Sequence, residues 1–361
     1  MKKLILTLSV GMLGAFAVQA QDVDVTFTGS TAFRGTVYNA IKALYAGTST
    51  ENATTLPASG ASRVTLKGKM ASVFGATRNV TVRLSWSGSG TGAAAVANGT
   101  PVTVNVNATP QGDAATTTTP ATFAFSDVFQ TSTTVANSPS MTDTVVGVIP
   151  FVWVKNTPVP ASVDNITAQN ARAIFGNGRL PVRFFTGVPT DTGIVNVEGR
   201  DSGSGTRITV LSETGVGGSA TIVQRKVSAG NYVADAVGFS GGGALATDLA
   251  LNVGTSANGA GGAIGYLGLG DAPTVTGAGG AILKYEGVPM TFDNVRSGKY
   301  TLWAYEHCFD AYSVAPGSDE DTLRTALATE IEVNQLATST TAIQFSTMKS
   351  TRLDDGATVT P

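Results

Sequence analysis

The sequence predicts an α/β fold with mostly parallel sheets, and three observations lead to this prediction. Stretches of alternating or continuous apolar residues, which are typical of strands, recur along the chain of 361 residues. Stretches with apolar residues at helical spacing follow them. In three of these strand-helix pairs, a loop rich in Gly, Ser and Thr joins the strand to the helix. Strands that alternate with helices in this order are typical of parallel sheets covered by helices.

The first strand-loop-helix unit begins close to the N-terminus. The stretch "VDVTFTGSTAF" has alternating apolar residues from Val23 to Phe27 and ends in a Gly-Ser-Thr turn. In the following "RGTVYNAIKALY", Val37 and Ile41 have the spacing of one helix face. We therefore expect a strand, a short polar loop and a helix.

The second unit repeats this pattern in "NVTVRLSWSGSGTGAAAVANG". A strand from Val80 to Trp86 leads through a Ser-Gly-Ser-Gly loop into an Ala-rich helix. Residues 108–122, "ATPQGDAATTTTPAT", are low in complexity, which predicts a surface loop or a β-excursion. The stretch "ATFAFSDVF" then predicts a short strand that ends at Ser126 and Asp127.

The remaining elements follow the same alternation. The nearly continuous apolar run "TVVGVIPFVWVKN" predicts a strand buried on both faces. A helix with an Asn/Thr cap and a Gly stop is predicted in "NITAQNARAIFGNG". Strand, loop and helix follow again in "GIVNVEGRDSGSGTRITVLSETG". Further along we expect a helix over 244–251, a strand over 264–267, and an amphipathic C-terminal helix with Leu323, Leu327 and Ile331 facing inward.

The N-terminus predicts export. Lys2 and Lys3 precede an apolar run over residues 4–18, and a small-residue site predicts cleavage after Ala20. We therefore expect a signal peptide over 1–20 and a periplasmic or secreted mature protein; an N-terminal anchor helix is the alternative. Charged residues are only 13% of the chain, which suits a compact exported protein better than a disordered one.

Charge and composition argue against several classes of function. A formal net charge of −2 without a basic block argues against a nucleic-acid partner. With one cysteine, Cys308, and one histidine, His307, the chain can form neither an internal disulfide nor a zinc site, and as sequence neighbours the two make no catalytic dyad. We predict no catalytic residue, no metal and no cofactor, and hence no enzyme. The three tryptophans are expected in the core.

The Gly/Ser/Thr loops predict an oxyanion site. In parallel sheets, loops of this kind meet helix N-termini beyond the carboxyl ends of the strands. Backbone amides at a helix N-terminus lack intrahelical partners, and hydroxyls add further donors. Helix capping explains any single loop equally well. Three such loops in one chain, with Arg200 beside the third, favour an anion as the shared ligand.

Asp127 is the unexpected member of this set, because a carboxylate repels an anion. Its presence makes sense if the ligand carries a proton that Asp127 accepts in a hydrogen bond. Such a site would take a protonated phosphate and reject sulfate, which offers no proton at neutral pH. The alternative is that Asp127 caps the turn after Ser126.

These loops together resemble a known family. "FTGSTAFRGTVYNAI", "SWSGSGTGAAAVANG", "FAFSDV", "GRDSGSGTR" and "GAIGYLGLGDA" occur in the order found in the phosphate-binding periplasmic proteins of ABC transporters. The resemblance covers about Val23 to Tyr305. It implies a type II periplasmic-binding-protein fold, in which two α/β lobes joined by crossover strands close a cleft on a dehydrated oxyanion. We place lobe one at residues 21–152 and 298–361, and lobe two at residues 153–297.

The resemblance also implies the site residues. In the first loop, Ala32 stands where the family has threonine, with Thr31 or Ser30 standing in, and Phe33 follows. In the second loop we expect Ser89, or alternatively Ser87. The family's aspartate two residues after the arginine is Ser202 here, and the acid has moved to Asp201, which leaves open how Arg200 is held. The predicted phosphate-binding residues are Thr31, Ala32, Phe33, Ser89, Asp127, Arg200, Ser204, Gly205 and Thr206.

The resemblance implies a secreted, monomeric solute-binding protein. It would capture inorganic phosphate, or a related oxyanion, and deliver it to the membrane permease of an ABC transporter. One alternative is a structural or surface protein on the same fold with weak or lost anion binding. The other is a phosphate-ester hydrolase, for which the sequence lacks a metal cluster and a nucleophile-base pair.

Overall fold

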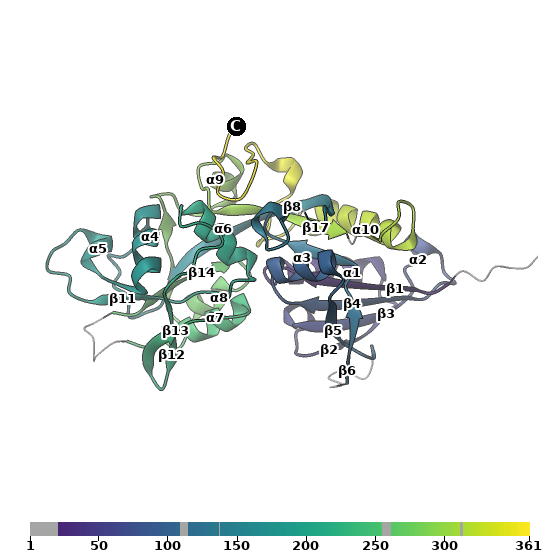
Figure 1. Ribbon diagram of the computed structural model, residues 1–361, viewed down its shortest axis with the longest axis horizontal. Coiled ribbons are helices and arrows are strands. Elements are labelled where there is room, and N and C mark those ends of the chain that lie inside the picture. Colours follow the sequence, from purple (N-terminus) through teal and green to yellow (C-terminus); the bar gives the residue numbers. More distant parts are fainter. Residues whose placement is uncertain (1–20, 109–114, 137, 255–260, 311–312) are drawn as a thin grey trace, which may run out of the picture.

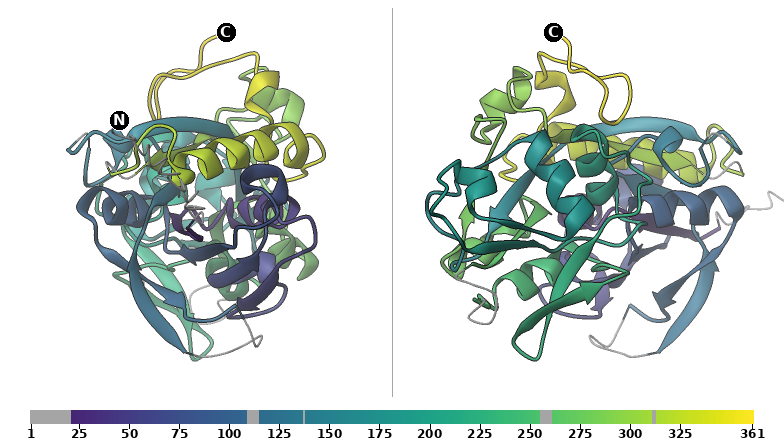
Figure 2. Two further views of the ribbon diagram at one scale, coloured as in Figure 1. Left: turned by 90° about the vertical axis from the view of Figure 1, so that its right-hand side faces the viewer. Right: turned by 60° about the vertical axis from the view of Figure 1, so that its left-hand side comes forward.

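The computed structural model describes residues 21–108, 115–136, 138–254, 261–310 and 313–361. The predicted signal peptide over 1–20 lies outside these ranges. Figure 1 shows two α/β lobes side by side, and Figure 2 shows them from two further directions. No helix among the described residues is both long and apolar enough to cross a membrane.

Lobe one contains the N-terminal strand and its neighbours. These strands are β1 (Val23–Gly29), β2 (Thr50–Ala53), β3 (Arg63–Gly68), β4 (Val80–Trp86) and β7 (Phe123–Ser126). Helices cover them: α1 (Arg34–Leu44), α2 (Ala71–Phe74), α3 (Ser89–Asn98), α10 (Asp319–Thr329) with its π-helical continuation η3 (Glu330–Gln335), and the short 3-10 turns η1 (Ala58–Gly60) and η2 (Gln130–Ser132). The first two strand-loop-helix units are therefore confirmed.

Lobe two repeats this arrangement with fewer strands. Its sheet contains β10 (Arg179–Pro181), β11 (Ile194–Val197) and β14 (Ala263–Gly268), with β15 (Ala281–Ile282) paired to the connecting strand. Its helices are α4 (Ala168–Asn177), α5 (Arg183–Thr186), α6 (Gly205–Glu213), α7 (Gly242–Leu249), α8 (Ala272–Gly277) and α9 (Phe292–Arg296). The helix expected over 244–251 begins and ends two residues earlier than expected.

Two strands connect the lobes: β8 (Thr142–Lys155) and β17 (Trp303–Asp310). Residues 142–150 of β8 pair with β17, and residues 151–155 pair with β14, so one strand belongs to both sheets. The strands of the two lobes named so far and the two connecting strands form one eleven-stranded sheet. Its order is β10-β11-β14-β8-β17-β7-β1-β4-β3-β2, with β15 added beside β8. Figure 1 shows both strands running across the junction.

The expectation of mostly parallel sheets is wrong, because the sheet is mixed. β1 is parallel to β4 and β7, and β11 is parallel to β14. β8 is antiparallel to β14 and β17, and β17 is antiparallel to β7. Within the lobes, β3 is also antiparallel to β2 and β4, and β10 to β11. For the connecting strands the reason is topological: β8 carries the chain into lobe two and β17 brings it back, so the two run in opposite directions. The continuous run of apolar residues correctly predicted that β8 is buried, but it carried no information on the direction of the strand.

Smaller two-stranded sheets complete the fold. Within the low-complexity stretch, residues 109–114 lie outside the described ranges, and β6 (Thr116–Pro120) pairs with β5 (Pro101–Asn105) as a β-excursion. Lobe two adds the hairpin β12 (Gln224–Ser228) and β13 (Asn231–Asp235), and the pair β9 (Asn165–Ile166) and β16 (Lys284–Tyr285). The last short element is the 3-10 turn η4 (Phe345–Thr347).

Local sequence signals explain the helix ends and the core. Thr167 caps α4 in a capping box with Asn170, and Gly178 ends that helix in the left-handed conformation. The tryptophans are buried as expected, with Trp153 and Trp303 inaccessible on the connecting strands. On the C-terminal helix the predicted inward face is confirmed, because its apolar residues Leu323, Leu327 and Ile331 are all buried.

Candidate anion-binding site

Four loops meet at the junction between the lobes. Three follow the parallel strands β1, β4 and β7 of lobe one, and the fourth follows β11 of lobe two. Three of these loops lead into helices, α1, α3 and α6. The loops therefore lie beyond the carboxyl ends of parallel strands, where α/β proteins bind ligands. The fold brings together the predicted site residues Thr31, Ser89, Asp127, Arg200, Ser204, Gly205 and Thr206.

Asp127 lies at the centre of these contacts and is 1% exposed. The Ser89 hydroxyl donates to one oxygen of its carboxylate, and Thr206 Oγ1 donates to the other at 3.3 Å. From α6, Thr209 Oγ1 also donates to the Asp127 carbonyl at 3.2 Å. Hydroxyls from both lobes thus converge on one buried carboxylate.

Ser126, and not Asp127, closes the turn after β7. The Ser126 hydroxyl donates to the Val128 carbonyl at 2.8 Å and accepts from the Val128 amide at 3.2 Å. The Asp127 side chain faces Ser89 and Thr206 instead. The capping interpretation of Asp127 is therefore wrong, and its carboxylate is directed to the junction.

Arg200 supplies the positive charge and is 2% exposed. Its Nε donates to the Phe239 carbonyl at 3.0 Å, and its Nη2 donates to the Ser240 carbonyl at 3.0 Å and to Thr31 Oγ1 at 3.2 Å. The Asp201 carboxylate instead accepts from an amide of its own loop. Backbone carbonyls therefore hold the guanidinium, which answers how it is positioned without an acid at residue 202.

The start of α6 presents Ser204, Gly205 and Thr206 to lobe one. Ser204 is the N-cap, and its Oγ accepts from the Arg207 amide at 3.3 Å. Capping therefore does explain this serine, but its hydroxyl keeps a proton that it can donate to a ligand. The amides of the first helical turn have no intrahelical partner, and they lie at the positive end of the helix dipole.

The first loop contributes through Thr31 and through the start of α1. The Thr31 hydroxyl accepts from Arg200, as described above, and so links the two lobes. Phe33 is the N-cap residue of α1, and its amide donates to Ser30 Oγ at 3.2 Å. The loop therefore uses the Phe33 amide internally. Ala32 is half-buried and faces Gly268 of lobe two. A Cβ atom added to Gly268 would lie 3.2 Å from the Ala32 methyl group.

Burial sets the electrostatics of the site. It raises the pKa of Asp127, against the positive charge of Arg200 and the hydroxyl groups of Ser30 and Thr206, which lower that pKa. Burial also lowers the pKa of Arg200, and the neighbouring Asp201 is the largest opposing influence. Arginine remains protonated in proteins, so the site combines the permanent positive charge of Arg200 with the Asp127 carboxyl group, which can accept or hold a proton.

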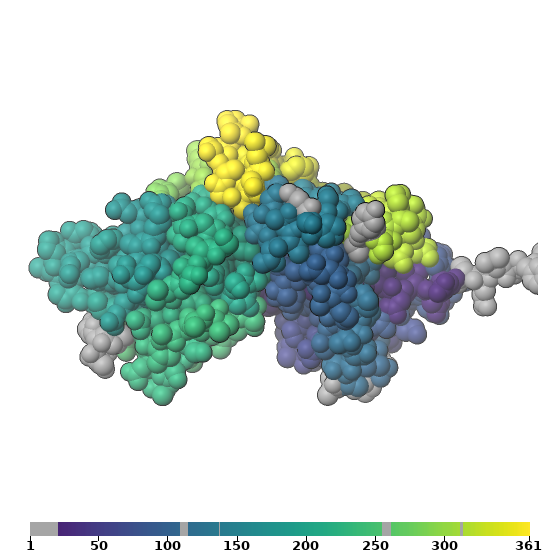
Figure 3. All heavy atoms as spheres, viewed as in Figure 1, coloured from purple at the N-terminus to yellow at the C-terminus, as the bar shows by residue number. Residues whose placement is uncertain are grey.

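The lobes approach closely at this point. The Gly90 amide of α3 donates to the Gly203 carbonyl at 3.0 Å, across the junction. A Cβ added at Gly88 would lie 2.8 Å from the same carbonyl oxygen, so the backbone can come this close only with glycine there. At the rim, Arg34 of α1 forms an ion pair with Asp271 of lobe two at 3.5 Å. Figure 3 shows the lobes in contact above a notch.

A cavity of about 440 Å³ opens beside the first loop. Its wall includes Thr31 and Ala32 from the site and the Arg34–Asp271 pair from its rim. Most of the other lining side chains carry hydroxyl or amide groups. The cavity therefore gives a polar approach to the buried groups.

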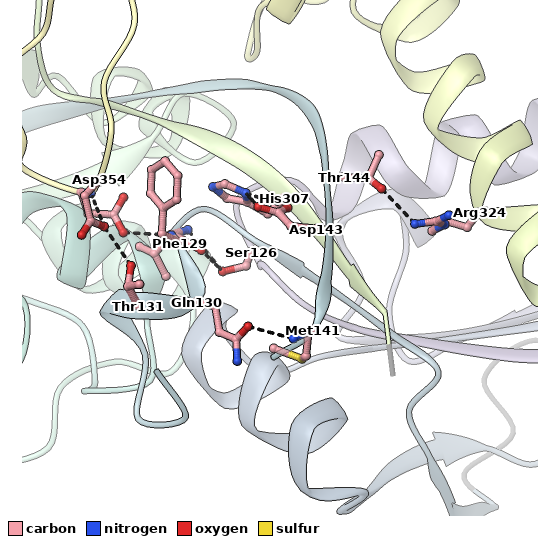
Figure 4. Close-up of polar contacts among 12 residues, drawn as sticks. Ser126, Phe129, Gln130, Thr131, Met141, Asp143, Thr144, His307, Arg324 and Asp354 are labelled. Carbon is pink, nitrogen blue, oxygen red and sulfur yellow. Dashed lines mark hydrogen bonds and ion pairs between the residues drawn. The ribbon is translucent and has the colours of Figure 1, made fainter. Parts of the chain in front are cut away.

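The C-terminal segment supports the loop that carries Asp127 (Figure 4). The Phe129 amide donates to Asp355 Oδ2 at 2.9 Å, and Thr131 Oγ1 donates to Asp354 Oδ1 at 3.0 Å. Figure 4 also shows His307 beside Asp143, with Nδ1 2.9 Å from either carboxylate oxygen. Segments that are far apart in the sequence thus fix the position of this loop.

The sequence did not indicate several of these contributions. The sequence could not indicate that the carbonyl groups of residues 239 and 240 hold Arg200, because every residue type supplies a backbone carbonyl. Ser30 was considered only as a substitute donor, whereas its hydroxyl accepts from the Phe33 amide. Among the described residues, no group of three or more His, Cys, Asp or Glu side chains could hold a metal ion.

No protein-family model and no curated protein matches the chain in sequence. Its structure is similar to that of a putative phosphate ABC transporter substrate-binding protein with bound phosphate from Clostridium perfringens. It is equally similar to that of an ABC-type phosphate transport receptor from Vibrio cholerae. Each is 14% identical, with a TM-score of 0.53, over 89% of this chain and 99% of the other. The resemblance is thus confirmed at the level of the fold, and the chain has the two-lobed α/β architecture of type II periplasmic binding proteins.

Proposed function

We propose that this protein captures inorganic phosphate between its two lobes and delivers it to the permease of an ABC transporter. The observation that carries the proposal is the buried pair of opposite groups at the junction. Arg200 supplies a guanidinium that can bind phosphate oxygens, and Asp127 supplies a carboxylate that can accept a proton from the ligand. The two bacterial proteins with the same fold are described as phosphate transport proteins, which supports this ligand.

The proposal includes the remaining predicted donors. Hydroxyls of Thr31 and Ser204 and backbone amides at the starts of α1, α3 and α6 would donate to the anion. The hydroxyls of Ser89 and Thr206, which donate to Asp127, would turn toward the anion when it binds. A donor shell of this kind, without a nucleophile-base pair among the residues described above, suits binding better than hydrolysis.

The proposal also includes the organisation of the chain. The mature protein would begin after Ala20, outside the cytoplasm, and act as a monomer. Its lobes would comprise residues 21–152 with 298–361, and residues 153–297. They would open and close through the connecting strands β8 and β17, so that phosphate touches both lobes when bound.

Calorimetry on the mature protein, stripped of ligand by partial unfolding, tests the proposal. We expect one phosphate to bind per chain at neutral pH, and sulfate to give no heat. In Asp127→Asn the charge-assisted hydrogen bond to the ligand is lost, which is worth about 1.5–3 kcal/mol, or roughly 10- to 150-fold in affinity. The amide can now donate to an unprotonated oxygen, so sulfate binding should become measurable.

A matched control makes the same change away from the site. Asp164 lies on the surface of lobe two and pairs with Lys284, and its side chain is 61% exposed. Asp164→Asn should bind phosphate and reject sulfate as the original protein does. Absence of phosphate binding by the original protein would end the proposal. Unchanged discrimination in Asp127→Asn would remove the proton-acceptor role.

A further inference from the structure

A second carboxyl group, that of Glu306, lies beside Asp127. On β17, His307 pairs with Ser126 and Cys308 pairs with Phe125 of β7. Glu306 directly precedes His307, and Asp127 directly follows Ser126, so both lie next to the last residue pair of these two strands. The Asp127 charge acts on the Glu306 carboxyl group, and the Ser30 hydroxyl lies close enough to act on both. Glu306 is completely buried, and neither of its carboxyl oxygens has a hydrogen-bond partner among the described residues.

Few other polar groups face Glu306. Gly147 of β8 lies opposite it on the other side, and α3, which packs against β17, carries no charged residue. The Ser30 hydroxyl lowers the pKa of both Glu306 and Asp127, although it forms no hydrogen bond of good geometry with Glu306.

Titratable neighbours occur on β17 itself. The thiol of Cys308 is buried there, with a pKa raised well above its ordinary value by burial, and Glu306 adds to that rise. His307 is paired with Asp143 of β8. Asp127 is therefore the carboxyl group that meets Glu306 at the anion site.

An ionised Glu306 would be costly at this position. A buried carboxylate without a partner loses its hydration, and the negative charge of Asp127 opposes ionisation further. Both effects raise the pKa of Glu306 well above its ordinary value. Asp201 lies between Arg200 and the buried Arg207 and offsets one of these two positive charges. Two further ionised carboxyl groups would therefore give the site a net negative charge, which opposes the entry of an anion.

We propose that Glu306 is a positioning residue of the anion site, and that the Asp127–Glu306 pair holds one proton when the anion binds. This inference rests on the proposed function, because it takes phosphate as the anion. With one proton on the pair, the charge of Arg200 is balanced before the ligand enters. Asp127 then remains able to accept the proton of the ligand, and Glu306 acts through Asp127.

The proposal fixes a direction for the effect of pH. As the pH rises, the free protein loses the proton of the pair, and the pair must then take a proton from solution again when phosphate binds. Affinity therefore falls with rising pH, by about tenfold per pH unit once the pair has ionised, because one proton is linked to binding. Phosphate itself also changes its protonation near neutral pH, so the comparison must be made with a variant that meets the same ligand.

The experiment measures phosphate affinity by calorimetry from pH 6 to pH 9.5 in Glu306→Gln and in the original protein. At each pH, buffers with different ionisation enthalpies give the number of protons taken up on binding. Glutamine keeps the shape of glutamate but does not titrate. We expect the original protein to lose affinity more steeply at alkaline pH than Glu306→Gln, and to take up as much as about one proton more.

Glu198→Gln provides the matched control. Glu198 is also completely buried with both oxygens unpartnered among the described residues, but its acidic neighbours are Asp248 and Asp235 of lobe two. This variant should keep the pH profile and the proton count of the original protein. A merely structural role of a buried carboxyl group would not produce this difference between the two variants.

The outcomes separate the two proposals. If the original protein binds no phosphate, the proposed function fails. If it binds phosphate and Glu306→Gln shows the same pH profile and proton count, the role of Glu306 alone is overturned. Should Glu306→Gln not fold, the infrared difference spectrum of the original protein on phosphate binding decides. A shifted band of a protonated carboxyl group supports the pair, and absence of that band overturns it.

Discussion

Gly205 offers the sharpest test of how the lobes meet. It is the first residue of α6 in lobe two, and it faces lobe one without a side chain. A Cβ added there would lie 2.5 Å from Asp127 Oδ1 and 2.6 Å from Ser89 Cβ, and still closer to Ser89 Oγ. Ordinary contacts of a Cβ atom begin at about 3.4 Å, so Gly205→Ala forces the lobes apart by about 1 Å at this point.

The size of the effect follows from the rigidity of these neighbours. Ser89 and Asp127 are both buried and hydrogen-bonded to each other, so neither can move aside freely. Adding a methyl group to a packed interior costs about 1–3 kcal/mol. If this cost arises only in the closed state, phosphate affinity falls by roughly 5- to 150-fold. The melting temperature of the ligand-free protein should change little.

Calorimetry gives the affinity, and small-angle X-ray scattering gives the compaction of the protein on adding phosphate. We expect Gly205→Ala to bind more weakly and to remain more extended with phosphate than the original protein. Gly176→Ala is the control, because Gly176 lies exposed on α4 and an added Cβ there meets no atom within 4 Å. That variant should keep its affinity and gain up to about 1 kcal/mol in free energy of unfolding. Full affinity and full compaction in Gly205→Ala would refute the reasoning.

Three further predictions concern charged groups. The Arg34–Asp271 pair is partly exposed and should be worth at most about 1 kcal/mol. Asp271→Asn should therefore lower phosphate affinity by no more than roughly fivefold, and by less at high salt. A hundredfold loss of affinity in calorimetry at two salt concentrations would contradict this. The Arg352 side chain is inaccessible, lies 3.2 Å from Glu213 and packs over an aromatic ring. Arg352→Met leaves the buried Glu213 carboxylate without its cation and should lower the free energy of unfolding in urea by about 3–5 kcal/mol. A decrease below about 1 kcal/mol would argue against this. Burial raises the pKa of Asp355 from 3.8 to about 6, so its contribution to the free energy of unfolding is present below pH 4 and disappears as the pH rises through about 6. This decline has an upper bound of about 3 kcal/mol, and urea unfolding at a series of pH values should show that Asp355→Asn lacks it. A decline in the variant equal to that of the original protein would contradict the assignment.

The order of strands and helices could be predicted from the sequence because local signals determine it. Alternating apolar residues from Val23 to Phe27 and the cap and stop signals around Thr167 and Gly178 act within a few residues of each other. The direction of β8 could not be predicted in this way. A buried strand is apolar whether its neighbours are parallel or antiparallel, and its direction follows from chain connections more than 100 residues apart.

The candidate site was predictable where function depends on side-chain type. The Ser-Asp after an apolar strand and the Gly-Ser-Gly-Thr loop marked Asp127 and Thr206, and the fold places them within hydrogen-bonding distance. Two features were not predictable. Arg200 is held by carbonyl groups of residues 239 and 240, which any amino acid supplies. Glu306 had only the weak signal of a single acid inside an apolar strand, and its meaning depends on the register between β17 and β7.

The 14-residue strand β8 has a consequence for how the molecule is built as a whole. Its first part completes the sheet of lobe one and its last part completes the sheet of lobe two, without a break in the strand between them. Melting of either lobe would therefore strip hydrogen-bond partners from the other, and the two should unfold as one cooperative unit. A gene fragment that encodes one lobe would leave it with an unfinished sheet. Each lobe would contribute its own half of the proposed anion site, whereas the shared strand makes the two lobes one folding unit.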